Sequence, residues 1–185
     1  SLASIFFSAI SSALSHHKKR SVEWSLVTPL SMGMIFGAVI GAGYAATLSS
    51  ENLKWIITIF LILIGIEMIS GFTQGLVSPF HGSWIGFLSS LIGIGGGSFT
   101  TPLMIAGGYN IRNGIGTAAA CGIPIAAAGT IGYAYFGQTS VGILPSGAFG
   151  FVFWPAVISI SIASIITAKI GANISHSVSE KNLKR

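Results

Sequence analysis

The stretch GIGGGSFTTP, residues 93–102, interrupts a long apolar region and decides how the chain folds. No Asp, Glu, Lys or Arg occurs from 68 to 111, so any backbone break here lies among apolar residues. Glycine costs about 1 kcal/mol relative to alanine in a helix, and the glycines at 95–97 therefore predict helix termination. Thr101 is a suitable N-cap and Pro102 a suitable first residue for a new helix.

The composition indicates whether this backbone break lies in water or in a lipid bilayer. The chain has 185 residues, of which only nine are basic and four acidic, and its mean hydropathy is +0.80. Charged residues make up 7% of the chain, against about 25% in a soluble domain. Uncharged runs also cover 24–50 and 113–168, and about 20 apolar residues suffice for a membrane-spanning helix. We therefore predict an all-α, polytopic transmembrane helix bundle in the plasma membrane.

Periodicity and breaks predict the individual segments. The predicted elements are the end of a helix that begins upstream and finishes at the basic residues 16–20, helices at 26–47 and 53–70, two short pieces at 81–94 and 102–108, a helix at 117–136, and an apolar stretch at 144–172 interrupted by Pro155. Gly33, Gly37 and Gly41 are spaced by four residues, which favours close packing of a neighbouring helix.

Two stretches of the chain are similar to each other. GAGYAATLSSENLKW begins at Gly41, and GANISHSVSEKNLKR begins 130 residues later at Gly171. We therefore predict two related units, the remainder of a first repeat at 1–70 and a second repeat at 71–185. If the basic residues 16–20 are cytoplasmic and 71–110 enters and leaves on one side, the other basic clusters and the C-terminus are also cytoplasmic, whereas the loops near 50 and 138 are outside. This arrangement is typical of inverted repeats in transporters.

A broken helix at membrane depth has a chemical consequence. Unpaired backbone is tolerated there only where it lines a cavity or is buried in protein. The start of a helix presents free N–H groups and a partial positive charge, and an anion is its natural ligand. NGIGTAAA predicts a second such start, at which Gly114 and Gly116 break the chain and Thr117 caps the next helix.

These motifs resemble those of a known family. GIGGGSFTTPLMI followed by GIGTAAA, together with SHHKKRSVEW and GAGYAATLSSENLK, resembles the sulfite exporter TauE/SafE family over nearly the whole chain. The resemblance implies a transporter of two related halves that moves sulfur-containing or organic anions, such as sulfite, thiosulfate or sulfoacetate. The family usually has serine where this chain has Ala118, so one hydroxyl that could contact substrate is missing.

The predicted site follows from the two glycine motifs. The candidate substrate-binding residues are Gly95, Gly96, Gly97, Ser98, Thr100, Thr101, Pro102, Gly116, Thr117 and Cys121. Cys121 follows Thr117 by one helical turn and is equally compatible with a buried apolar position. Tight helix crossing without a ligand is the alternative for the glycines. Arg112 is either a cytoplasmic loop charge or part of an anion funnel.

Proton coupling has two candidates. Glu67 is the one carboxylate within a predicted span, and His81 begins the first short piece. Near the membrane interface, each side chain could equally serve only to anchor its helix.

Other functional classes are less well supported by the sequence. The chain contains no Asp, no His pair on one helical face within a span and no phosphate-binding loop, so an intramembrane enzyme or an ATP-driven pump lacks its usual residues. The single cysteine excludes a disulfide framework and a multi-cysteine metal site, and we predict no cofactor. The net charge of +5 indicates topology rather than nucleic-acid binding. A structural or assembly subunit, with glycines used only for packing, remains an alternative.

Overall fold

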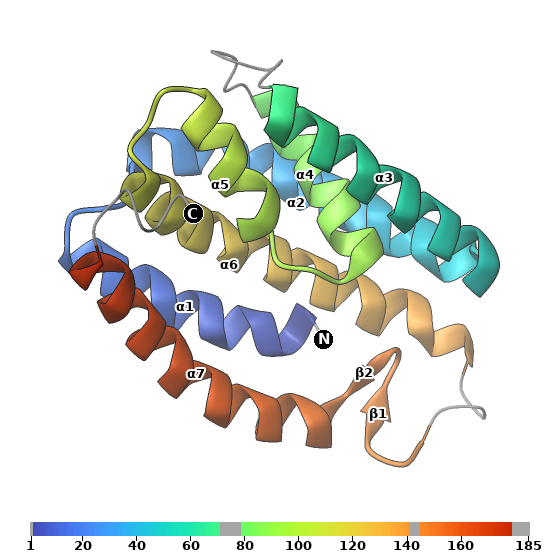
Figure 1. Ribbon diagram of the computed structural model, residues 1–185. Coiled ribbons are helices and arrows are strands. Elements are labelled where there is room, and N and C mark those ends of the chain that lie inside the picture. The colour runs from blue at the N-terminus through green and yellow to red at the C-terminus, as the bar shows by residue number, and fades with distance from the viewer. Residues whose placement is uncertain (1, 71–78, 141–144, 179–185) are drawn as a thin grey trace.

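The computed structural model describes residues 2–70, 79–140 and 145–178, and α-helices make up most of them (Figure 1). The elements in chain order are α1 (Leu2–Lys18), α2 (Trp24–Thr47), α3 (Ser50–Ser70), α4 (Pro79–Ile92), α5 (Gly97–Ala106), α6 (Ile111–Phe136), a 3-10 turn (Gly137–Ser140), β1 (Ala148–Phe149), β2 (Val152–Phe153) and α7 (Trp154–Ser177). The two strands form a small antiparallel hairpin, in which Ala148 pairs with Phe153 and Phe149 with Val152.

Three of these helices are long and apolar enough to cross a membrane, namely α2, α6 and α7, with 24, 26 and 24 residues. Helix α6 lies at the centre, where it packs against α1, α2 and α5. Helix α7 packs on the far side of α1, and α4 lies along α2. The predicted all-α transmembrane bundle is confirmed.

Helices α4 and α5 form the predicted broken segment. They contain 14 and 10 residues, which correspond to lengths of about 21 Å and 15 Å. Neither length spans a hydrocarbon core of about 30 Å. Helix α4 runs into the bundle and α5 returns toward the end at which α6 begins, as Figure 1 shows. The pair is therefore a re-entrant helical hairpin.

Glycines bring α2 and α4 into backbone contact. A Cβ atom at Gly37 or Gly41 of α2 would collide with the backbone of α4, and a Cβ atom at Gly82 or Gly86 of α4 would collide with that of α2. The obstructing atoms are carbonyl oxygens. Gly37 faces that of Ser83 and Gly41 that of Phe87, whereas Gly82 faces that of Leu30 and Gly86 that of Met34. The predicted packing role is confirmed for Gly37 and Gly41, because only glycine permits this separation.

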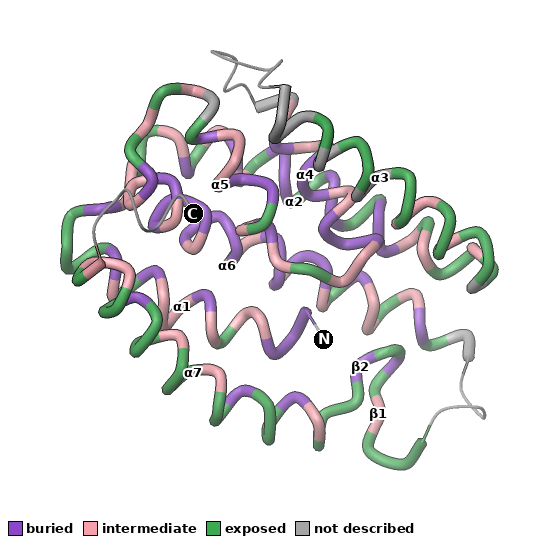
Figure 2. The backbone as a smooth tube through the Cα atoms, in the orientation of Figure 1, coloured by how far each residue is buried: buried purple, intermediate pink, exposed green. Residues whose placement is uncertain are grey.

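The apolar core lies between α2, α4, α5 and α6, whereas the outer helices expose apolar side chains. Figure 2 shows buried backbone concentrated in the centre and exposed residues along α3 and α7. On α7, Ile158, Ile162 and Ile166 expose 59%, 62% and 58% of their surface. Such a face is stable in lipid rather than in water, which agrees with an integral membrane protein.

Two predicted boundaries outside the broken segment are wrong. Helix α6 begins at Ile111, with Asn110 as N-cap, and not at Thr117, because the backbone remains helical through both of its early glycines. The stretch 144–172 is not one apolar segment interrupted by Pro155. Its described part forms the hairpin and then α7, and Pro155 lies in the first turn of α7, where its missing N–H group costs nothing.

Candidate functional site

The end of α4 is defined by Gly93. This residue has φ of +76°, a left-handed conformation that glycine adopts without strain. Its N–H group donates to the carbonyl of Ser90 at 3.2 Å, and the N–H of Ile94 donates to that of Ser89 at 3.0 Å. These two bonds form a Schellman motif. The prediction that the glycines at 95–97 end the helix is therefore wrong, since the chain leaves the helix two residues earlier.

Helix α5 begins at Gly97, with Gly96 as its N-cap. The Gly96 carbonyl accepts hydrogen bonds from the N–H groups of Phe99 at 3.2 Å and Thr100 at 2.9 Å, so the first turn forms before Thr101. Thr101 is therefore not the N-cap and Pro102 is not the first helical residue, contrary to prediction. Both lie inside α5.

The start of α5 leaves backbone donors free. Within the described residues, the N–H groups of Gly96, Gly97 and Ser98 have no acceptor, and no side chain caps this end. The free donors carry the partial positive charge of the helix N-terminus. The expected helix start with free N–H groups is thus present, five residues earlier than the sequence placed it.

Buried hydroxyl groups without partners surround this turn. Ser89, Ser90 and Thr100 are fully buried, and their side-chain oxygens have no hydrogen-bond partner in the described part of the chain. The Thr100 hydroxyl lies 3.7 Å from the position that a Cβ atom of Gly96 would occupy. Thr130 of α6 carries a fourth hydroxyl of this kind. Buried polar groups normally find partners, so these unpartnered hydroxyls mark the turn as a candidate binding site.

A cavity of about 200 Å³ adjoins the turn. It is partly open to the outside and is lined by the first turn of α1, the end of α4, the second half of α6 and the β-hairpin, through Leu2, Ala3, Gly93, Thr130, Tyr133, Phe151 and Val152. The Tyr133 hydroxyl donates to the Ser90 carbonyl at 2.7 Å and so ties α6 to the end of α4. Backbone donors, hydroxyls and cavity together form the candidate site.

The turn lies halfway along the central span. A Cβ atom at Gly96 would meet the side chain of Ile125, which is near the middle of α6. A Cβ atom at Gly95 would meet Ile5 of α1. If α6 crosses the bilayer, the start of α5 is therefore close to the midplane.

The second glycine motif is part of a different region. Gly116 is covered by the Ser21 carbonyl, and the Thr117 hydroxyl accepts a hydrogen bond from the N–H of Glu23 at 3.0 Å. The predicted break at Gly114 and Gly116 and the predicted cap at Thr117 are wrong, because all three residues lie within α6. Gly116 and Thr117 pack against the segment that joins α1 to α2, whereas Gly114 packs against α5.

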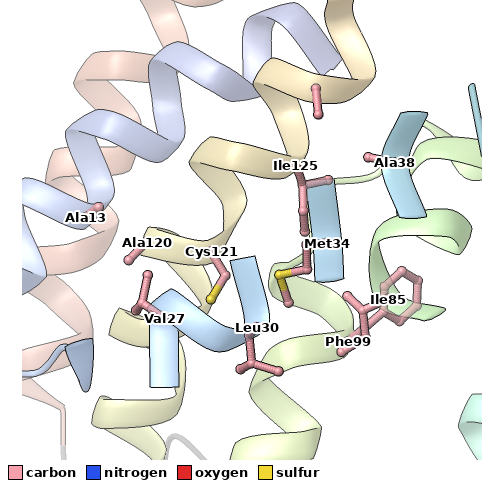
Figure 3. Packing of buried hydrophobic residues seen from close by; sticks show 11 residues of the cluster. Ala13, Val27, Leu30, Met34, Ala38, Ile85, Phe99, Ala120, Cys121 and Ile125 are labelled. Atoms are coloured by element: carbon pink, nitrogen blue, oxygen red, sulfur yellow. The ribbon is translucent and has the colours of Figure 1, made fainter. Parts of the chain in front are cut away.

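Cys121 lies in the apolar core and not at the turn. It is fully buried, and Figure 3 shows it beside Val27, Leu30 and Met34. Its alternative interpretation as a small apolar residue therefore fits this environment.

Polar residues from three parts of the chain meet where α6 begins. Arg112 donates to the carbonyl of Val178, just beyond α7, at 3.0 Å. Nδ1 of His16 and Nε2 of His176 are 3.1 Å apart. The Asn113 amide donates to the Glu23 carboxylate at 2.7 Å. This end of the bundle, here called the polar end, joins α1, α2, α6 and α7.

The remaining candidates are dispersed. His81 is half-buried near the start of α4, about eight helical residues before the Ser89–Ser90 pair, and Nδ1 has no described partner. Glu67 belongs to α3, and its side chain lies outside the described residues. No group of three metal-binding side chains occurs in the described ranges. The structure thus brings Gly95, Gly96, Gly97, Ser98 and Thr100 together at the turn that adjoins the cavity, with Thr101 and Pro102 next in α5. It places Gly116, Thr117, Cys121 and Arg112 away from this turn.

Comparison with known proteins agrees with this architecture. The sulfite exporter TauE/SafE family matches residues 1–185. The chain belongs to the TauE/SafE family. A protein of Haemophilus influenzae, named a probable membrane transporter protein, is 28% identical to this TauE/SafE chain. The aligned region covers 100% of this chain and 73% of the relative. A protein of Methanocaldococcus jannaschii with a similar name is 27% identical over 100% of the chain and 71% of the relative. No solved structure matches significantly.

Together, the family and the apolar helices identify a membrane transporter. Sequence reasoning found that the chain breaks within 93–102 but misplaced the helix end and the helix start, and its candidate site residues did not include Gly93, Ser89, Ser90, Thr130 and Tyr133. The adjacent serines in an otherwise apolar helix were the available signal, since two hydroxyls on successive residues cannot both face lipid.

Proposed function

We propose that this TauE/SafE protein is a secondary transporter of small anions, and that the start of α5 binds the anion. Sulfite, thiosulfate and sulfoacetate are the proposed substrates, in keeping with the sulfur-containing and organic anions that the family resemblance implies. The observation that carries the proposal is the start of α5, where free N–H groups adjoin fully buried hydroxyls without partners, such as Thr100. An oxyanion accepts several hydrogen bonds and would satisfy both kinds of donor.

Transport also requires that the site be reached from both sides. We propose two related halves, 1–70 and 71–185, that move around the turn. Helices α2 and α7 support this proposal because both have 24 residues and both begin with tryptophan, 130 positions apart. Their packing corresponds as well, since α2 packs on α6 and α7 packs on α1. The stretch SLASIFFSAISSALSHH at 1–17 can be aligned with AAACGIPIAAAGTIGYAY at 118–135, which pairs α1 with α6. These two contacts are then equivalent under one exchange of halves.

The proposed orientation places the polar end in the cytoplasm. Arg20, Arg112 and the end of α7 lie at this end, whereas α2 and α6 end at the opposite side of the bundle (Figure 1). The predicted cytoplasmic residues Lys181, Lys184 and Arg185 lie outside the described residues. Single cysteines at Arg20 and Gln138, in a Cys121→Ser background, should react with an impermeant thiol reagent from opposite sides. Labelling of both from one side would overturn the topology.

The function itself is tested by flux. The purified protein in proteoliposomes should take up radiolabelled sulfite, thiosulfate or sulfoacetate, and Thr100→Val should reduce the initial rate by at least about tenfold, because a lost hydrogen bond to a charged ligand costs about 1.5–3 kcal/mol. Thr167→Val is the matched control, since Thr167 is exposed on α7 and bonds only to its own helix. Absence of flux for every anion, with folded protein, would contradict the proposal.

Coupling to protons is a finer proposal for the same assay. An inward proton gradient should accelerate uptake if Glu67 or His81 exchanges a proton during transport. Glu67→Gln and His81→Gln should then each be tested with and without the gradient. Equal rates under both conditions in the unsubstituted protein would exclude proton coupling.

A further inference from the structure

Helices α1 and α7 run side by side and meet through hydroxyl groups (Figure 1). The serines of α1 at positions 4, 8, 11 and 15 fall on one face of that helix, because their spacings are four, three and four residues. The Ser11 hydroxyl donates to the Ile165 carbonyl of α7 at 3.0 Å, so this face is directed at α7. Helix α7 packs mainly on α1, and a buried residue of α7 therefore faces the same contact. We call this contact the serine seam, which contains Ser4, Ser8, Ser11 and Ser15 of α1 and Ser161 of α7.

Two hydroxyls of the serine seam lack partners. Ser4 and Ser161 expose only 3% and 6% of their surface, and their side-chain oxygens form no hydrogen bond within the described ranges. Serines that only join two helices usually find a partner, as Ser11 does. A second arrangement of the seam, in which water or an anion reaches these hydroxyls, would satisfy them.

The inner end of the serine seam lies beside the start of α5. Ile5 follows Ser4 in α1, and a Cβ atom at Gly95 would meet the Ile5 side chain. From Ser4 the row of serines continues for 11 residues to Ser15, or about 17 Å, and His16 comes next. The seam therefore leads from the candidate site to the polar end.

The end of the seam next to the β-hairpin is apolar. Ala3 of α1, Val152 of the hairpin and Val157 of α7 form one buried cluster, and Tyr133 packs against it. Separation of the two helices here would expose apolar surface, which is unfavourable in water. This end is therefore suited to serve as a hinge.

The opposite end of the seam is held by polar groups. Nδ1 of His16 and Nε2 of His176 are 3.1 Å apart, and Nζ of Lys19 donates to the Ala172 carbonyl at 3.5 Å. Water can replace each of these partners, so the net cost of parting α1 and α7 at this end is small. His16 is only 1% exposed, and the histidine pair therefore lies inside the contact and closes it.

We infer that the serine seam is the path between the start of α5 and the polar end, and that the contact between His16 and His176 is its gate. This inference rests on the proposed anion transport and specifies the route. In the open state, α1 and α7 part at the polar end and stay joined beside the hairpin. The row of hydroxyls then faces water and donates in turn to an oxyanion that passes along it. Because α1 and α7 belong to different proposed halves, opening is a movement of one half relative to the other.

The first test joins the gate covalently. His16→Cys and His176→Cys are combined in a Cys121→Ser background, and the protein in proteoliposomes is treated with a short bifunctional maleimide that links two thiols. Bridging should reduce the flux of sulfite, thiosulfate or sulfoacetate at least about tenfold relative to the untreated variant, because α1 and α7 can no longer part. Unchanged flux after bridging would overturn the inference.

The matched control joins α2 to α4. The rings of Tyr44 and Phe87 are 6.2 Å apart, close to the 5.1 Å between those of His16 and His176. Glycines already hold these two helices in backbone contact, so a bridge between Tyr44→Cys and Phe87→Cys should change flux by less than about twofold. Equal loss in both bridged variants would overturn the inference. Absence of flux for all three anions in the unsubstituted protein would instead contradict the proposed function.

A second measurement does not depend on flux or on the histidine variants. Ser8→Cys, in the same Cys121→Ser background, should react with an impermeant thiol reagent added on the side of the polar end, because the open seam admits water. Phe7→Cys is the control, since Phe7 is 40% exposed on the outer surface of α1, where lipid disfavours the reactive thiolate. We expect Ser8→Cys to react at least about tenfold faster than Phe7→Cys. Equal rates, or no reaction of Ser8→Cys, would overturn the inference even if the bridged variants behaved as expected.

Discussion

Two segments of this chain look alike in sequence and differ in structure. GIGGGSFTT, beginning at Gly93, breaks the backbone between α4 and α5, whereas NGIGTAAA, beginning at Asn113, lies within the continuous helix α6. Both combine glycines with a threonine that is fully buried. In the first segment, glycine allows a left-handed turn and the threonine has no described partner. In the second segment, Gly116 leaves room for the Ser21 carbonyl, and the Thr117 hydroxyl accepts a hydrogen bond from the N–H of Glu23. A glycine motif therefore indicates either a left-handed turn or a close contact with neighbouring backbone. The surrounding structure decides which of the two forms.

The largest effect is expected at Gly116. In Gly116→Ala the new methyl group would collide with the Ser21 carbonyl, which belongs to the backbone and cannot rotate away. We expect a loss of about 3 kcal/mol or more in the free energy of unfolding, measured as thermal denaturation in detergent. Gly114→Ala is the matched control, because its methyl group would make only ordinary contacts of 3.4 Å or longer. Equal destabilisation by both would show that the helix, and not the carbonyl contact, requires glycine.

The two threonines should separate stability from function. Thr117→Val removes the acceptor of the Glu23 N–H group and should lower the free energy of unfolding by about 1–3 kcal/mol. Thr100→Val removes no described hydrogen bond and should leave the unfolding midpoint unchanged or raised, while it impairs anion flux. If Thr100→Val were as destabilising as Thr117→Val, Thr100 would have a structural role and the comparison between the segments would fail.

The turn itself is tested at Gly93. Gly93→Ala meets no atom within 4 Å, so its cost arises from the left-handed φ alone and should be about 1–2 kcal/mol. Gly97→Ala also has open space but lacks a positive φ, and it should be neutral or slightly stabilising in the first turn of α5. The two midpoints of thermal unfolding should therefore differ by several degrees. Coinciding midpoints would argue against a Schellman end at Gly93.

The smallest effect concerns the link between the turn and α6. Tyr133→Phe removes the 2.7 Å hydrogen bond to the Ser90 carbonyl and should lower the free energy of unfolding by about 1 kcal/mol. Tyr135→Phe is the control, since Tyr135 is 69% exposed. Identical unfolding of both variants would mean that α6 does not hold the end of α4 in this way.

Sequence predicted the membrane bundle and the broken segment because their signals are strong and local. A run from 68 to 111 without charge and a cluster of glycines can be read without knowing what surrounds them. It could not predict which glycine turns left-handed, because a Schellman end at Gly93 depends on where α4 happens to stop packing on α2. Nor could it separate Thr100 from Thr117. The partner of Thr117 is an N–H group 94 residues earlier in the chain, so only tertiary structure reveals it.

The interlocked glycines of α2 and α4 also constrain how the protein can move. Backbone in contact with backbone leaves no layer of side chains that could slide, so these two helices must travel as a rigid body. The contact between α1 and α6 differs, because Leu2 and Ala9 meet Gly129 and Gly122 through their side chains. Side-chain contacts of this kind permit small shear displacements. Relative movement of the two proposed halves would therefore have to keep α4 with α2 and take place at side-chain contacts such as that between α1 and α6.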